Sequence, residues 1–154
     1  EVIPDELVQK MKNASKFNQG FAVTEYVAAS YLDMDWHTLT EPVEHDAREF
    51  ENASLERIGL IPEIVSRYRS TYFQHIFNDD FYAAGYFSYM WAEVLDADAF
   101  QAFKEKGLFD QDLAASFRKN ILAAGGSDDP MELYKKFRGS EPGIEPLLRK
   151  RGLI

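Results

Sequence analysis

The stretch that decides the fold is HIFNDDFYAAGYFSY, residues 75–89. Its second half begins a long apolar and aromatic pattern with helical spacing, which predicts one helix from Tyr82 to Phe103. On such a helix Tyr82, Tyr86 and Tyr89 share one face, because residues three, four and seven positions apart lie above one another. Alanine, glycine and serine lie between them and let another group approach closely. The pattern therefore predicts a stripe of three phenols.

The predicted stripe, with His75 preceding it across a loop, admits two interpretations. The phenols could donate hydrogen bonds to an oxyanion that develops during a reaction. Alternatively, the rings form an aromatic stripe packed into a core, with their hydroxyls bonded at its edge. The spacing on its own favours the core interpretation.

The rest of the chain shows helical spacing almost throughout, which predicts an all-α fold. Further helices are expected over residues 5–17, 21–39, 47–58, 108–124 and 130–137, and after residue 142. Residues 60–80 have the least regular pattern. Since no repeat, low-complexity segment or linker is visible, residues 1–154 are expected to form a single all-helical unit.

Aspartates and prolines mark several of the expected helix boundaries. Asp46 is expected to cap the helix over 47–58. Asp128 or Asp129 is expected to cap the helix that begins at Pro130. Pro42 is expected to end the helix before it, because proline disfavours helical backbone in the preceding residue.

Composition excludes several classes of protein. Seventeen basic against 26 acidic residues give a net charge of −9, which disfavours binding to nucleic acid. The absence of cysteine excludes disulfides and thiolate metal sites. No apolar run reaches the ~18 residues of a membrane helix, so no membrane span is expected. No signal peptide is visible in the first residues. The sequence also lacks an initiator methionine, so we expect a fragment or processed piece of a larger protein.

The histidines do not form a recognisable metal motif. They are His37, His45 and His75, and no two have the i, i+4 spacing of a helical zinc pair. His37, beside Trp36, is expected to be structural. The segment Glu44-His45-Asp46 is a weak candidate for a surface metal site, but a polar turn and helix cap explain it better. We therefore expect no metal site in this chain.

Three segments carry a resemblance to a known family: YFQHIF at 72–77, YAAGYFSYMW at 82–91 and EVLDAD at 93–98. Their order and spacing resemble a signature of the zinc metallopeptidase family that includes thimet oligopeptidase and dipeptidyl carboxypeptidase (peptidyl-dipeptidase). Matches at 4–18, 67–70 and 137–153 extend the resemblance over essentially the whole chain. The Ala-Ala-Gly after Tyr82 is more similar to the dipeptidyl-carboxypeptidase branch. The resemblance implies a multi-helix C-terminal catalytic subdomain of a larger helical peptidase.

The resemblance also implies roles for individual residues. In the family, the matching residues border the active-site channel and contact the substrate opposite the zinc. It thus implies catalytic roles for Tyr82 and His75, which would stabilise the oxyanion, and substrate-binding roles for Tyr86 and Tyr89. The parent would be a zinc-dependent hydrolase that releases dipeptides from the C-termini of short peptides.

The family's zinc ligands, a His-Glu-x-x-His helix and a further Glu, have no match in this sequence. The Zn²⁺ of the parent enzyme is therefore expected to bind the upstream part of the same polypeptide, and the isolated chain is expected to be inactive. The alternative is a non-catalytic all-helical module for peptide binding or interaction. A subdomain cut from a larger enzyme is also expected to self-associate through an exposed apolar face.

One loop departs from the family's pattern. Glycines are usual between the histidine and the first tyrosine, whereas this chain has Asn78-Asp79-Asp80-Phe81, one residue longer. Aspartate has less backbone freedom than glycine and adds negative charge where a peptide's carboxylate would bind. The compartment, cytoplasmic or periplasmic, is left open by the sequence.

Overall fold

The computed structural model describes residues 2–41, 44 and 46–154, and within these ranges it contains helices and turns but no strand. The all-α prediction is confirmed. The chain forms two compact units, the first ending at Tyr89 and the second running from Met90 to Ile154. None of the helices in the described ranges is long and apolar enough to cross a membrane.

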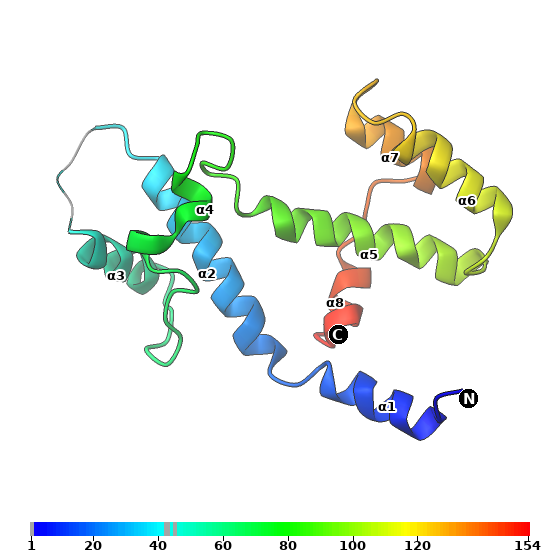
Figure 1. Ribbon diagram of the computed structural model, residues 1–154, viewed down its shortest axis with the longest axis horizontal. Helices are drawn as coiled ribbons and strands as arrows, with labels where there is room; N and C mark the ends of the chain where they lie inside the picture. Colours follow the sequence, from blue (N-terminus) through cyan, green and yellow to red (C-terminus); the bar gives the residue numbers. More distant parts are fainter. Residues whose placement is uncertain (1, 42–43, 45) are drawn as a thin grey trace. The chain divides into compact units, whose positions relative to one another are not determined.

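The first unit is organised around one long helix (Figure 1). Its elements are α1 (Asp5–Ala14), α2 (Gln19–His37), α3 (Ala47–Arg57), the 3₁₀ turn η1 (Ser70–Tyr72) and α4 (Gln74–Phe77). The first helix ends three residues before the expected Phe17. Asn18 takes a left-handed conformation with φ 58°, so a right-handed helix cannot pass through it, and α2 begins at the next residue.

The core of the first unit lies against α2. Ala29 of this helix is buried with Phe73, Ile76 and Tyr86, which follow α3 in the chain, Ile76 within α4 and the other two outside helices. Partly buried rings, those of Tyr26, Trp36 and Tyr68, pack against this cluster. The core therefore ties the loops around residues 73 and 86 to the long helix.

The beginning of α3 confirms one predicted cap. The side chain of Asp46 accepts hydrogen bonds from the backbone N–H groups of Arg48 and Glu49, at 2.9 and 3.0 Å. These donors have no partner within the helix, so the carboxylate stabilises its first turn. The predicted break at Pro42 and the weak metal candidate at His45 lie outside the described residues.

The predicted helix from Tyr82 to Phe103 is wrong at its start, because α5 spans Ser88–Lys106. Ala84 has φ 55°, which a right-handed helix cannot contain. The N–H of Gly85 instead bonds the carbonyl of Tyr82 at 3.0 Å, which closes a tight turn. Only Tyr89 lies in the helix, and the predicted helical stripe of three phenols does not form.

The second unit contains most of α5 together with the helices that follow it (Figure 1). These are α6 (Gln111–Phe117), a π-helical turn η2 (Arg118–Leu122), α7 (Pro130–Arg138) and α8 (Glu145–Arg151). Asp129 caps α7 as predicted, accepting from the N–H groups of Met131 and Glu132. The helix expected over 108–124 begins later, because Asp110 caps it by accepting from Leu113 N–H at 2.7 Å.

A buried carboxylate lies in the second unit. Asp98 of α5 is 5% exposed and accepts a hydrogen bond from the hydroxyl of Tyr134 at 2.6 Å. Arg138 Nε donates to the same carboxylate oxygen at 3.2 Å. Burial, and then the bond to Asp98, raise the pKa of Tyr134, so this phenol stays protonated as a donor. These bonds fasten α7 to α5.

Replacing Tyr134 by phenylalanine is expected to lower the free energy of unfolding by about 1–3 kcal/mol, because Asp98 loses a donor where water cannot replace it. Urea unfolding followed by circular dichroism measures this. The control is Tyr31→Phe, the same change at a phenol that is 47% exposed. Equal losses in the two variants would contradict the role given to Tyr134.

Candidate functional site

The structure brings the four sequence-predicted site residues together, although not on one helix face. His75 lies in α4, Tyr82 and Tyr86 lie in the turns before α5, and Tyr89 lies in its first turn. Nε2 of His75 is hydrogen-bonded to the Tyr89 hydroxyl at 2.7 Å. The imidazole lies 4.6 Å from the ring of Tyr82 and 5.9 Å from that of Tyr86, measured between centroids. His75 is therefore the centre of the cluster.

An open pocket of about 400 Å³ lies beside this cluster. Its lining is mostly aromatic, with polar tips: Tyr26, Tyr68, Tyr72, Phe73, Gln74, His75, Tyr86 and Tyr89. The Tyr82 ring lies tilted against that of His75 and does not line the pocket. Such a surface offers both ring faces and hydrogen-bond donors to a ligand.

Tyrosines of the cluster differ in their exposure. Tyr82 and Tyr89 are each 40% exposed, whereas Tyr86 is 5% exposed and belongs to the core. The core interpretation of the sequence pattern thus describes Tyr86, while the other two rings reach solvent. Tyr82 and Tyr89 are therefore the more accessible phenols of the cluster, and Tyr86 also lines the pocket.

Two phenols of the cluster, those of Tyr86 and Tyr89, have a raised pKa. Burial raises the pKa of Tyr86, and the neighbouring phenols Tyr26 and Tyr68 raise it further. Loss of hydration and the neighbouring Tyr82 also raise the pKa of Tyr89. Both groups therefore remain O–H donors throughout the neutral pH range.

A positive charge lies next to two rings of the pocket lining. The guanidinium of Arg67 lies 5.7 Å from the ring centroid of Tyr26 and 5.6 Å from that of Tyr68. Arg67 also pairs with Glu25 at 3.0 Å. The charge is thus compensated by a carboxylate and shared with two ring faces.

The turn that carries Tyr82 and Tyr86 is fixed by a residue that the sequence analysis missed. Asp33, 0% exposed in α2, accepts hydrogen bonds from the N–H groups of Ala84 at 3.0 Å and Tyr86 at 2.8 Å. His37 Nδ1 lies 2.7 Å from the same carboxylate. The available signal was that Asp33 follows a mostly uncharged stretch, residues 21–32, in which Glu25 is the charged residue, and that a histidine lies four positions after Asp33.

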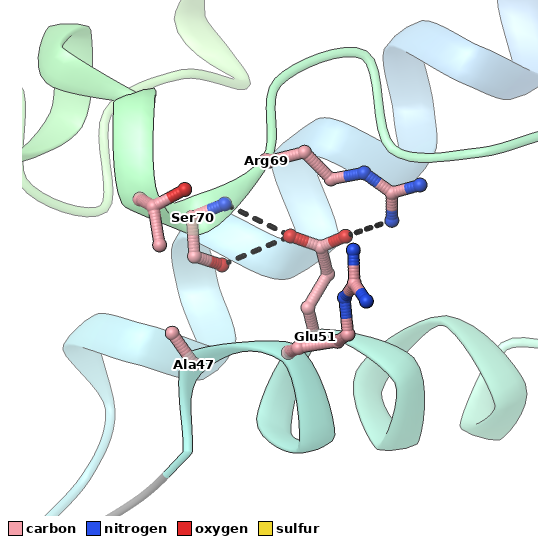
Figure 2. A pocket seen from close by; sticks show the side chains of 6 residues that line it. Ala47, Glu51, Arg69 and Ser70 are labelled. Atoms are coloured by element: carbon pink, nitrogen blue, oxygen red, sulfur yellow. Dashed lines mark hydrogen bonds and ion pairs between the residues drawn. The ribbon is translucent and has the colours of Figure 1, made fainter.

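A second buried carboxylate holds the segment before α4, as Figure 2 shows. Glu51 of α3 is 2% exposed and accepts from the backbone N–H of Ser70 at 2.8 Å and from its hydroxyl at 3.2 Å. Its other oxygen pairs with Arg69 at 2.5 Å. Trp36 Nε1 donates to the Ser70 hydroxyl at 3.0 Å. These bonds anchor η1, whose central residue lies four positions before His75.

No zinc site is found in the part of the chain that the structure describes. There, no three histidine, aspartate or glutamate side chains lie close enough together to hold a metal ion. The carboxylates of Asp33 and Glu51 are already bonded to backbone and side-chain donors. These residues do not fit a zinc ion, so no step of a reaction is assigned to a metal within them.

The fold and cluster define a helical unit with an aromatic, donor-rich pocket and no fitting metal site among its described residues. Residues 1–153 match Peptidase family M3, and the chain therefore belongs to this family, whose members are zinc metallopeptidases. The predicted family resemblance is confirmed.

Individual relatives support the same placement. The chain is 44% identical to dipeptidyl carboxypeptidase of Escherichia coli over 98% of its own length and 22% of that protein. It is 36% identical to oligopeptidase A of Escherichia coli over 99% of its length and 22% of the relative. It is 38% identical to the organellar oligopeptidase A of Arabidopsis thaliana over 100% of its length and 20% of the relative. The chain thus spans about a fifth of the length of these curated relatives.

Replacing Glu51 by glutamine is expected to lower the free energy of unfolding by about 1–3 kcal/mol, because the amide keeps one acceptor but loses the charge that pairs with Arg69. Chemical denaturation measures the loss. Glu56→Gln, an exposed position on the same helix, is the control and is expected to change stability by less than about 0.5 kcal/mol. A Glu51 variant as stable as this control would contradict the anchoring role.

Proposed function

We propose that this chain is part of a zinc-dependent peptidase that releases dipeptides from the C-termini of short peptides. The observation that carries the proposal is the contact of His75 with Tyr82 and Tyr89 at the edge of an open pocket. The similarity to a protein named dipeptidyl carboxypeptidase supports the substrate class. The zinc ligands belong, in this proposal, to the remaining polypeptide.

Tyr82 and His75 are the proposed oxyanion-stabilising groups. Attack on a peptide carbonyl places negative charge on its oxygen, and donors already in position stabilise that charge without reorganising. The Tyr82 hydroxyl is a suitable donor because its ring reaches solvent. The His75 ring lies next to the Tyr82 ring and can donate from an imidazole N–H.

Tyr86 and Tyr89 are the proposed substrate-binding residues. Tyr89 lines the pocket and is bonded to His75, so a bound peptide meets a phenol whose direction is already set. Tyr86 contributes the face or edge of a ring that the core holds in place. Fixed donors and rings reduce the entropy lost on binding a flexible peptide.

The remaining polypeptide is the proposed partner of this chain. Several large apolar side chains are exposed in the described residues: Phe17, Phe81, Phe87, Trp91, Phe100 and Phe109. Contact with the remaining polypeptide would remove these side chains from water. Alone, the chain is proposed to cover them by self-association.

The isolated chain is expected not to cleave peptides, because the proposal places the zinc and its activated water elsewhere in the polypeptide. Incubation with blocked tripeptides and zinc, with and without a chelator, followed by chromatography of the products, measures this. Efficient cleavage that the chelator abolishes would contradict the proposed division of the site.

In the full-length protein, Tyr82→Phe is expected to lower kcat by about 10²-fold, the usual cost of removing one oxyanion donor, with a smaller effect on KM. Steady-state kinetics with a blocked tripeptide measures both constants. Tyr31→Phe is the matched control, and its kcat is expected to equal that of the wild type. If Tyr82→Phe leaves kcat unchanged, the alternative of a non-catalytic peptide-binding or interaction module describes this cluster better.

A further inference from the structure

We propose that Asp33 and His37 are positioning residues for the histidine–tyrosine cluster. In this proposal they hold the turn at Ala84–Tyr86 in the conformation that sets Tyr82 against His75. That these residues hold the turn is argued from the geometry alone, whereas their effect on catalysis rests on the proposed function. Neither side chain lines the aromatic pocket, so both act through the backbone and rings that they contact.

The bonds of Asp33 reach far along the chain. Its Oδ1 accepts from the N–H of Ala84 and its Oδ2 from the N–H of Tyr86, 51 and 53 residues further on. A buried carboxylate is costly unless donors surround it, and these two amides are among the donors it has. The same amides belong to a turn that has no helix or sheet to satisfy them. The carboxylate thus gains donors, and the two amides gain an acceptor.

The turn does not have a conformation that its residues favour. Ala84 has φ 55°, a left-handed value that a residue with a Cβ disfavours. The backbone is also tightly closed, since a Cβ placed on Gly85 would lie 3.2 Å from the carbonyl oxygen of Tyr82. Such conformations persist only where surrounding contacts impose them. The Asp33 carboxylate is a contact that bonds this turn from outside.

His37 connects the carboxylate to the other half of the cluster. Its Nδ1 lies 2.7 Å from Asp33 Oδ1 and 2.9 Å from the Asp33 carbonyl oxygen. Because both oxygens are acceptors, Nδ1 carries the proton and donates to them. Its ring centroid lies 5.5 Å from that of Phe77, in the helix that also carries His75. The pair therefore contacts both the tyrosine turn and the short helix α4.

Asp35 provides a matched control on the same helix. Its carboxylate accepts from the Ser54 hydroxyl at 2.5 Å and pairs with Arg57, both of α3. It makes none of the bonds to the turn that Asp33 makes. Asp33→Asn and Asp35→Asn are thus the same chemical change at two paired carboxylates, of which one holds the turn.

The first test measures the amide hydrogen exchange rates of the chain by NMR. In Asp33→Asn the N–H groups of Ala84 and Tyr86 are expected to exchange at least about tenfold faster than in the wild type, because a charge-assisted acceptor is lost. In Asp35→Asn their rates are expected to be unchanged. Equal rates in the wild type and Asp33→Asn would overturn the proposal.

The second test is steady-state kinetics of the full-length protein. Asp33→Asn is expected to lower kcat by at least about tenfold, because a small displacement of a reacting group is costly, while KM changes less. Asp35→Asn is expected to keep the wild-type kcat. An unchanged kcat in Asp33→Asn, where Tyr82→Phe lowers it, would overturn the positioning role. If Tyr82→Phe also leaves kcat unchanged, the proposed function fails, and the exchange rates alone decide whether Asp33 holds the turn.

A second variant covers the case in which Asp33→Asn does not fold. His37→Leu keeps the Asp33 carboxylate and removes one of its donors. The His37 side chain is 20% exposed. It is expected to accelerate exchange at the Ala84 and Tyr86 amides and to lower kcat, both less than Asp33→Asn. Wild-type exchange at both amides in a folded His37→Leu protein would overturn the proposal.

Discussion

Two buried carboxylates hold the irregular backbone on which the candidate site is built. Asp33 of α2 binds the turn that carries Tyr82 and Tyr86, and Glu51 of α3 binds the turn before His75. Backbone N–H groups in such segments lack partners from secondary structure and cannot be left buried and unbonded. The carboxylates satisfy them, and the aromatic core packs around the result. The positions of the site residues therefore depend on these two helices.

Local features of the structure could be predicted from the sequence, because their causes lie within a few residues. The caps at Asp46 and Asp129 and the all-helical fold are examples. The start of α5 could not, because its cause, the Asp33 carboxylate, lies 51 residues before Ala84. Helical spacing of Tyr82, Tyr86 and Tyr89 predicted a shared face, whereas a left-handed turn brings the three rings around His75.

Family membership and the site geometry give different information about this chain. The chain belongs to Peptidase family M3 and spans about a fifth of the length of its curated relatives. Its described residues form a histidine–tyrosine cluster beside an aromatic pocket and no site that fits zinc. We propose a division of labour in which this chain supplies donors and binding surface and the rest of the polypeptide supplies the metal.

The most direct test of this account is a crystal structure of the full-length protein with a bound peptide analogue. We expect the carbonyl oxygen at the position of cleavage to lie within about 2.6–3.2 Å of the Tyr82 hydroxyl or a His75 ring nitrogen. We also expect the peptide to contact Tyr89. A peptide bound at the zinc with none of these three side chains in contact would contradict the central claim.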